Sequence, residues 1–217
     1  MKKSLFTYHF SRYTLALALL LIAGSATAKK VKLTIDGTLS PTQRTLYLIV
    51  NEDTANAQRI AITDAKFSVN LKVDANDIIR LHDWKEWPER SVFVLLPDSR
   101  HITINWRTGT IEGSPKSLRM QEAIREARED DPSGFHIDVF SDDKEAWEQA
   151  RIRGESIRAQ MLAQQKQTIM RLIKENNNNI GAWLAYCYAP IFEGGLPQMT
   201  NGTTPKWLSH PIFKAHK

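Results

Sequence analysis

The chain has 217 residues, and its 29 Lys and Arg against 24 Asp and Glu give a net charge of +5. Without Lys2, Lys3 and Arg12 the count is 26 against 24, or +2, which argues against a nucleic-acid binder because such proteins concentrate basic residues in a stripe. The single cysteine, Cys187, excludes a disulfide within one chain, so an apolar core must stabilise the fold.

The first residues have the pattern of an export signal. Basic residues precede a short apolar run, Leu15 to Ala23, and Ala26 and Ala28 offer the small side chains that a signal peptidase recognises. The alternative is an uncleaved membrane anchor, but the run is about half of the roughly 20 residues that a spanning helix needs. We therefore expect a signal peptide over residues 1–28, cleavage near Ala28, and a periplasmic or secreted, soluble mature protein with no membrane span.

Short apolar or alternating stretches follow one another from residue 29 to residue 113. Asp64 and Ala65 separate two of these stretches and predict a tight hairpin. Because no helix-length segment separates the strands, we predict an α+β protein whose first domain is an antiparallel β-sandwich or a partly closed barrel. The seven or eight predicted strands lie at residues 31–37, 45–51, 59–63, 66–73, 78–83, 91–96, 101–106 and 109–113.

The pattern becomes helical at Ser114, which suits a helix cap and is followed by Pro115, a residue favoured in the first turn. Apolar residues then recur at helical spacing, with breaks at residues 129–140 and 176–179. These signals predict three helices in an extension over residues 114–190. The remaining residues, 191–217, are rich in Gly and Pro and predict an irregular tail.

Several segments resemble a bacterial domain of unknown function that precedes the thioredoxin-like domain of exported AhpC/TSA-type thiol-disulfide oxidoreductases. They are VKLTIDGTL with TLYLIV, ITDAKFSVNL, and HITINW with IEGSPKSLRMQEA, and RLIKENNNNIGAWLAY is similar to the helix pair that follows that domain. The likeness covers residues 30 to 190, although Ala65 replaces the usual glycine. It implies that a redox domain with a Cys-x-x-Cys pair comes next, and the 27 residues after Pro190 are too few to build one.

Cys187 lies in a predicted apolar helix with Trp183 and Leu184, and not at a helix N-terminus, where the pKa of a thiol falls. We expect it to pack as a small apolar side chain. An intermolecular disulfide and a reactive thiol are the alternatives.

Two histidine–carboxylate pairs, His82–Asp83 and His136–Asp138, have the residue types of a metal site or an acid–base pair, but no zinc-ligand spacing accompanies them. A group of acidic residues lacks the fixed spacing of a calcium loop, and its members are Glu129, Asp130, Asp131, Asp138, Asp142 and Asp143. We therefore expect solvated side chains and helix caps, and we predict no catalytic residue, no metal site and no cofactor.

The segment LHDWKEWPER places Trp84 and Trp87 in a loop between two predicted strands. Indole rings in a loop are suited to contact a protein partner or a glycan, although they also fold back onto a core. The leading hypothesis is an exported, non-enzymatic accessory or interaction protein with a periplasmic protein partner, such as a separately encoded thiol-disulfide oxidoreductase. The second hypothesis is a glycan or small-ligand binder that uses both tryptophans, and the third is a cryptic enzyme.

Overall fold

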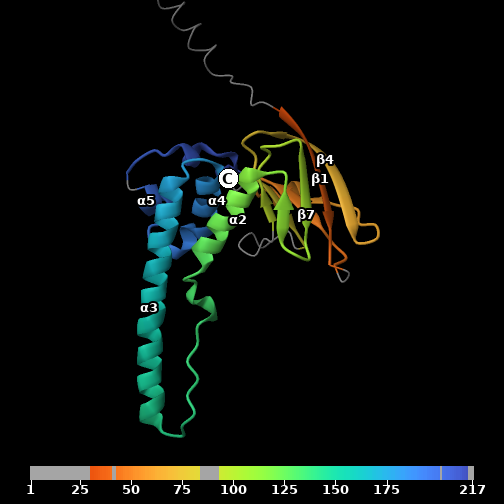
Figure 1. The fold of residues 1–217 in the computed structure, drawn as a ribbon. Coiled ribbons are helices and arrows are strands. Elements are labelled where there is room, and N and C mark those ends of the chain that lie inside the picture. Colours follow the sequence, from red (N-terminus) through yellow and green to blue (C-terminus); the bar gives the residue numbers. More distant parts are fainter. Residues whose placement is uncertain (1–29, 41–42, 84–92, 201, 215–217) are drawn as a thin grey trace, which may run out of the picture.

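The computed structural model describes residues 30–40, 43–83, 93–200 and 202–214. In these ranges eight strands form two four-stranded sheets, and helices follow them (Figure 1). The first sheet has the order β4-β1-β7-β8 and the second has the order β3-β2-β5-β6. The strands are β1 (Lys30–Thr38), β2 (Tyr47–Val50), β3 (Gln58–Arg59), β4 (Lys66–Asp74), β5 (Ile79–His82), β6 (Phe93–Leu95), β7 (His101–Asn105) and β8 (Thr110–Glu112).

One strand pair differs from the antiparallel arrangement that the sequence predicts. β1 pairs with β7 in parallel, from Thr34 opposite His101 to Thr38 opposite Asn105. A parallel pair needs a long crossover, which is usually a helix, and here the chain between β1 and β7 forms the four strands of the second sheet and β4 of the first. The sheets are also separate and not closed into a barrel.

One face of each sheet contributes to a shared hydrophobic cluster. Side chains alternate between the two faces of a strand, so β1 buries Leu33 and Ile35 while Thr34 lies on the other face. The tight turn predicted at Asp64 and Ala65 is confirmed, and both residues have positive φ angles, 51° and 55°. The predicted hairpin is reduced to a single bridge between Thr63 and Lys66, because β3 ends at Arg59 and pairs with β2, whereas β4 pairs with β1. The buried members of the cluster are Leu33, Ile35, Leu39, Leu46, Leu48, Ile60, Phe67, Val69, Val73, Ile79, Leu81, Phe93, Leu95, Ile102, Ile104 and Ile111.

A buried ion pair fixes the turn after β2. Arg80 lies in β5 between Ile79 and Leu81 and therefore projects from the opposite face of the sheet. Its Nε and Nη2 atoms donate to the two carboxylate oxygens of Glu52 at 2.7 and 2.8 Å, and both side chains are almost fully buried. Removal of one partner of such a pair costs about 3–5 kcal/mol, because the other charge stays buried without compensation.

The helices begin where the sequence predicts caps. The Ser114 hydroxyl accepts a hydrogen bond from the Ser117 amide, and the Asp143 carboxylate accepts one from the Glu145 amide. Asn178 caps the third long helix through the Ile180 amide. The helices are α2 (Pro115–Arg128), α3 (Lys144–Glu175), α4 (Asn179–Tyr188) and α5 (Gly195–Thr200), with 3₁₀ turns η1 (Thr54–Asn56), η3 (Pro132–Gly134), η4 (Ala189–Ile191), η5 (Lys206–Ser209) and η6 (Pro211–Phe213).

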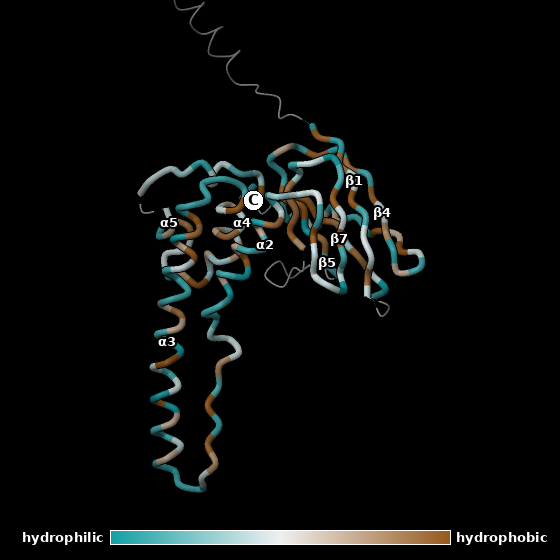
Figure 2. The backbone as a smooth tube through the Cα atoms, in the orientation of Figure 1, coloured by the Kyte–Doolittle hydropathy of each residue, from teal (hydrophilic) through white to brown (hydrophobic). Residues whose placement is uncertain are grey.

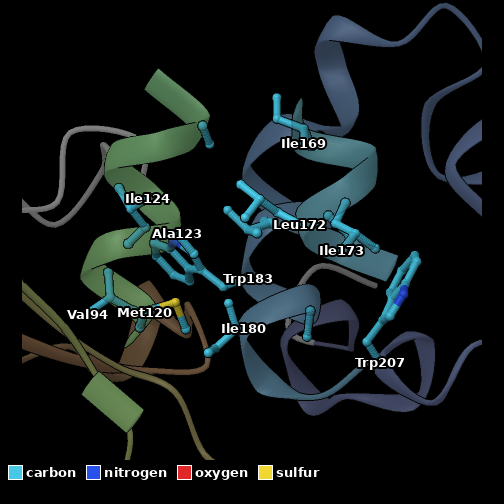
Figure 3. Packing of buried hydrophobic residues seen from close by; sticks show 14 of the residues in the cluster. Val94, Met120, Ala123, Ile124, Ile169, Leu172, Ile173, Ile180, Trp183 and Trp207 are labelled. Carbon is cyan, nitrogen blue, oxygen red and sulfur yellow. The ribbon is translucent and has the colours of Figure 1, made fainter. Parts of the chain in front are cut away.

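A second hydrophobic cluster joins these helices to the second sheet. Val94 of β6 belongs to it, whereas its neighbours Phe93 and Leu95 belong to the cluster between the sheets. Figure 3 shows Trp183 of α4 lying between the apolar face of α2 and Leu172 of α3. The second sheet is thus buried on both faces, and its outer face fixes the position of the helices. The labelled members of this cluster are Val94, Met120, Ala123, Ile124, Ile169, Leu172, Ile173, Ile180, Trp183 and Trp207.

The segment after Pro190 is more ordered than the irregular tail that its composition predicts. It contains α5 and two 3₁₀ turns, and its buried residues Phe192, Met199, Trp207 and Ile212 belong to the helical cluster. The Gly and Pro residues shorten each helix but leave enough apolar side chains to cover α4. Composition alone therefore underestimates the order of this segment.

His210 joins this C-terminal segment to the turn between β4 and β5. Its Nδ1 atom accepts a hydrogen bond from the Ile212 amide at 3.1 Å, so Nε2 carries the proton and donates to the Asn76 carbonyl at 2.6 Å. Burial lowers the pKa of His210, while the Asn76 carbonyl and Asp77 partly oppose this shift.

Because its folded-state pKa is lowered, His210 binds a proton more readily when the chain is unfolded. The free energy of unfolding should therefore be unaffected well above about pH 6.5 and should decrease as the pH falls below it. Urea denaturation at about pH 8 and about pH 5, followed by tryptophan fluorescence, measures this difference. His210→Gln should lose part of the pH dependence, and an identical pH dependence in both proteins would contradict the assignment.

Candidate functional site

The first half of α3 projects beyond the rest of the molecule (Figure 1). α3 has 32 residues and is therefore about 48 Å long, but its buried apolar residues, Ile169, Leu172 and Ile173, all lie in its last turns. The chain between α2 and α3 runs outward beside the projecting half to its tip, where α3 begins and leads back to the body (Figure 1). We call the extended residues 135–141 the return segment, and the return segment together with residues 144–158 of α3 the arm.

The return segment packs on α3 with every second side chain. Phe135, Ile137 and Val139 are half-buried, and together with α3 they line an open groove of about 460 Å³. His136, Asp138 and Phe140 alternate with them and are exposed. Figure 2 shows this segment as a mainly hydrophobic stretch beside a more polar helix. The alternation is that of a β-strand with one apolar face, although no second strand accompanies it in the described part of the chain.

Gly154 allows the return segment to approach α3 closely. It is buried, unlike most of its neighbours on the arm, and a Cβ atom at this position would lie 3.4 Å from Cδ1 of Ile137. α3 continues through Gly154 without a break. The glycine therefore acts as the contact point between the two parts of the arm.

Two side chains of α3 hold the ends of the return segment. The guanidinium of Arg158 donates to the Phe135 carbonyl at 2.9 and 3.3 Å, and the indole of Trp147 donates to the Ser141 carbonyl at 2.6 Å. Between these two anchors, no hydrogen bond of the described residues involves a backbone N–H or C=O of residues 136–140. The segment is thus held in an extended conformation with its backbone polar groups unpaired.

Three charged side chains of α3 on the arm, Glu148, Arg151 and Glu155, are paired with one another. Arg151 donates to Glu148 and to Glu155, each at 2.6 Å. These hydrogen bonds raise the pKa of Arg151 and lower the pKa of Glu148, so both groups stay charged over the physiological range. The arm is therefore not a patch of one sign, and its distinguishing feature is apolar.

Three of the four large hydrophobic side chains that are exposed in the described ranges lie on the arm. Phe140 is 97% exposed, Ile152 is 55% exposed and Trp147 is 52% exposed. The fourth, Leu118, lies on α2 and is 45% exposed. Trp147 and Ile152 are five residues apart in α3 and therefore lie about 140° apart around the helix. Large apolar side chains exposed on several sides of one projection are suited to a partner that wraps around it.

Residues singled out from the sequence lie elsewhere or have local roles. Trp84 and Trp87 fall in residues 84–92, outside the described ranges. Cys187 is half-buried and packs against the helical cluster, in agreement with the expected packing role.

The histidine–carboxylate pairs and the acidic residues also have local roles. Nδ1 of His82 lies 3.1 Å from Oδ1 of the neighbouring Asp83, and Nε2 of His136 lies 3.8 Å from Oδ2 of Asp138 on the arm. Asp131 and Asp143 act as caps of η3 and α3. No group of three His, Cys, Asp or Glu side chains in the described ranges is arranged to hold a metal ion.

Sequence reasoning missed the arm, because residues 129–140 were interpreted only as a break between helices. The signal that could have found it is the two-residue period of Phe135, Ile137 and Val139, which predicts a strand with one apolar face.

Comparisons with known proteins give no relative from which to assign a function. No protein-family model, no curated protein and no solved structure matches this chain. Within the residues that the structure describes, no helix is both long enough and apolar enough to cross a membrane.

Substitution at Gly154 tests the geometry of the arm. Gly154→Leu should displace Ile137 and release the return segment, because a leucine side chain cannot fit in the 3.4 Å approach. Limited proteolysis with chymotrypsin should then cut next to Phe135 or Phe140 roughly tenfold faster than in the parent protein.

Gly154→Ala is the matched control, because its methyl group makes an ordinary contact with Ile137 and alanine favours a helix by up to about 1 kcal/mol. Its cleavage rate should be unchanged or lower. Equal cleavage of the leucine and alanine variants would show that the return segment does not depend on this contact.

Proposed function

We propose that this protein is an exported, non-enzymatic interaction protein that binds a periplasmic protein partner through its arm. We also infer that the two sheets, with their shared hydrophobic cluster, form a β-sandwich body that carries the arm. Export is inferred from the signal-peptide pattern of residues 1–28, which lie outside the described ranges.

The observation that carries the proposal is the exposure of Phe140, Trp147 and Ile152 on one projection. Large apolar side chains in water are unfavourable by about 25 cal/mol per Å² of apolar surface relative to burial. Aromatic side chains that become buried in a partner also supply much of the affinity of protein interfaces. A partner that covers the arm would remove this surface from water.

The shape of the groove favours a protein partner over a small ligand. Small molecules bind in concave sites that enclose most of their surface. The groove of the arm instead runs between a helix and an extended segment on a projection that stands clear of the body (Figure 1). An elongated open groove of this kind suits an extended or helical polypeptide. The glycan hypothesis depends on Trp84 and Trp87 and stays a prediction from the sequence.

Affinity capture with surface variants tests the proposal. Phe140→Ser combined with Ile152→Ser should abolish the capture of proteins that the parent protein retains from native periplasmic extract, because both exposed side chains would become buried against the partner. Thermal denaturation should be unchanged, since neither side chain belongs to a hydrophobic cluster.

Leu118→Ser is the control, because Leu118 is also exposed but lies on α2 and away from the arm. It should leave capture unchanged. Capture that survives the double arm variant, or that is lost equally with Leu118→Ser, would contradict a docking role for the arm.

A further inference from the structure

We propose that the arm binds a second copy of this chain, through antiparallel pairing of the two return segments with Ile137 of each copy on the two-fold axis. This inference rests on the proposed function, since it names one partner of the same arm. It follows from three features of the return segment: its preformed conformation, its apolar face and its order of charges.

The return segment is prepared for strand pairing before any partner binds. Arg158 and Trp147 hold its ends, and the backbone groups of residues 136–140 make no hydrogen bond with the described residues. An extended segment with unpaired N–H and C=O groups is a template for the addition of another strand. Because the conformation is already fixed, pairing orders few further dihedral angles and loses little conformational entropy.

The order of imidazole and carboxylate side chains favours one register of self-pairing. With Ile137 opposite Ile137, His136 of each copy faces Asp138 of the other, so the imidazole–carboxylate contact that each chain makes within itself at 3.8 Å gains two cross-strand counterparts. A register centred on Asp138 would place the two Asp138 side chains opposite each other, and one centred on His136 would do the same for the two histidines. The segment is therefore complementary to itself about Ile137.

The same register also places the apolar side chains correctly. Opposite residues of an antiparallel pair lie on the same face, so Phe135 of one copy pairs with Val139 of the other. All these side chains then face the two α3 helices, while the His136 and Asp138 side chains face solvent, as they do in the single chain, where they are 73% and 67% exposed. The two-stranded ribbon would cover the open grooves of both arms.

A second copy fits these features better than an unrelated strand, because an unrelated strand must supply the matching charges independently. Self-pairing also leaves room for another partner. Ile152 lies two residues from Gly154 and therefore about 200° around the helix from the side that contacts the return segment. A dimer would still expose Ile152.

Cross-linking with two single-cysteine variants tests the register. His136→Cys and Asp138→Cys, each combined with Cys187→Ser, should form a disulfide-linked dimer when the two proteins are mixed and oxidised, because opposite Cα atoms lie about 4.5–5.5 Å apart. Each variant alone should form about tenfold less dimer, since its cysteine then faces a residue that is not cysteine. Equal cross-linking in the mixture and in the separate proteins would overturn the register.

Sedimentation equilibrium of the whole mature chain tests the association itself. The parent protein should dimerise, and His136→Asp should weaken dimerisation roughly tenfold because it places like charges opposite each other twice. His136→Asp combined with Asp138→Lys should restore dimerisation, and both positions are exposed, so the monomer should stay folded.

The two proposals fail in different ways. Self-pairing is overturned if the parent protein stays monomeric at high concentration. If Phe140→Ser with Ile152→Ser still abolishes the capture of other proteins in that case, the proposed interaction role of the arm is retained. Dimerisation that is equal in the parent protein, His136→Asp and the double charge variant also overturns self-pairing through the return segment. If capture is insensitive to the double arm variant as well, the proposed function fails with it.

Discussion

The arm depends on the anchoring of α3 in the helical cluster. Ile169, Leu172 and Ile173 are buried near the C-terminal end of this helix, against α2 and α4. An isolated helix is only marginally stable in water, so the first half of α3 relies on this anchor and on the return segment for its order. Phe135, Ile137 and Val139 cover one side of that half. The exposed apolar side chains of the arm are therefore a consequence of a helix that is longer than the body that holds it.

The anchor in turn depends on a sheet that is buried on both faces. Phe93 and Leu95 of β6 pack toward the first sheet, while Val94 packs toward α2 and α4. The Arg80–Glu52 pair fixes the turn after β2 to the neighbouring strand β5 on the same sheet. The second sheet thus positions the helices, and the helices position the arm. The return segment is the last of these parts and has no further layer over it among the described residues.

Much of this architecture could be predicted from the sequence, because it is set by local signals. Alternating apolar residues predicted most of the strands, Asp64 and Ala65 predicted a tight turn, and Ser114 predicted the start of α2. The parallel pairing of β1 and β7 could not be predicted, because it depends on contacts between residues that are far apart in the sequence. The order of the C-terminal segment depends on the burial of Trp207 and Ile212 in a cluster built mainly by earlier helices.

The candidate site was not predicted, because the alternation of Phe135, Ile137 and Val139 has no neighbouring strand in the sequence to pair with. A single short strand between two helices is therefore interpreted as a loop. The tryptophans that the sequence favoured, Trp84 and Trp87, lie outside the described ranges.

The central claim is that the return segment is an extended strand whose backbone pairs only when a partner binds. Hydrogen–deuterium exchange of its backbone amides tests this claim most directly. In dilute protein we predict that the amides of residues 136–140 exchange almost as fast as in an unfolded chain, whereas those of Leu172 and Ile173 are strongly protected. As the protein concentration rises, protection of residues 136–140 should increase at least about tenfold while protection in the body stays constant. Slow exchange of these amides in dilute protein would contradict the account. Fast exchange at every protein concentration, with no change when periplasmic extract is added, would also contradict it.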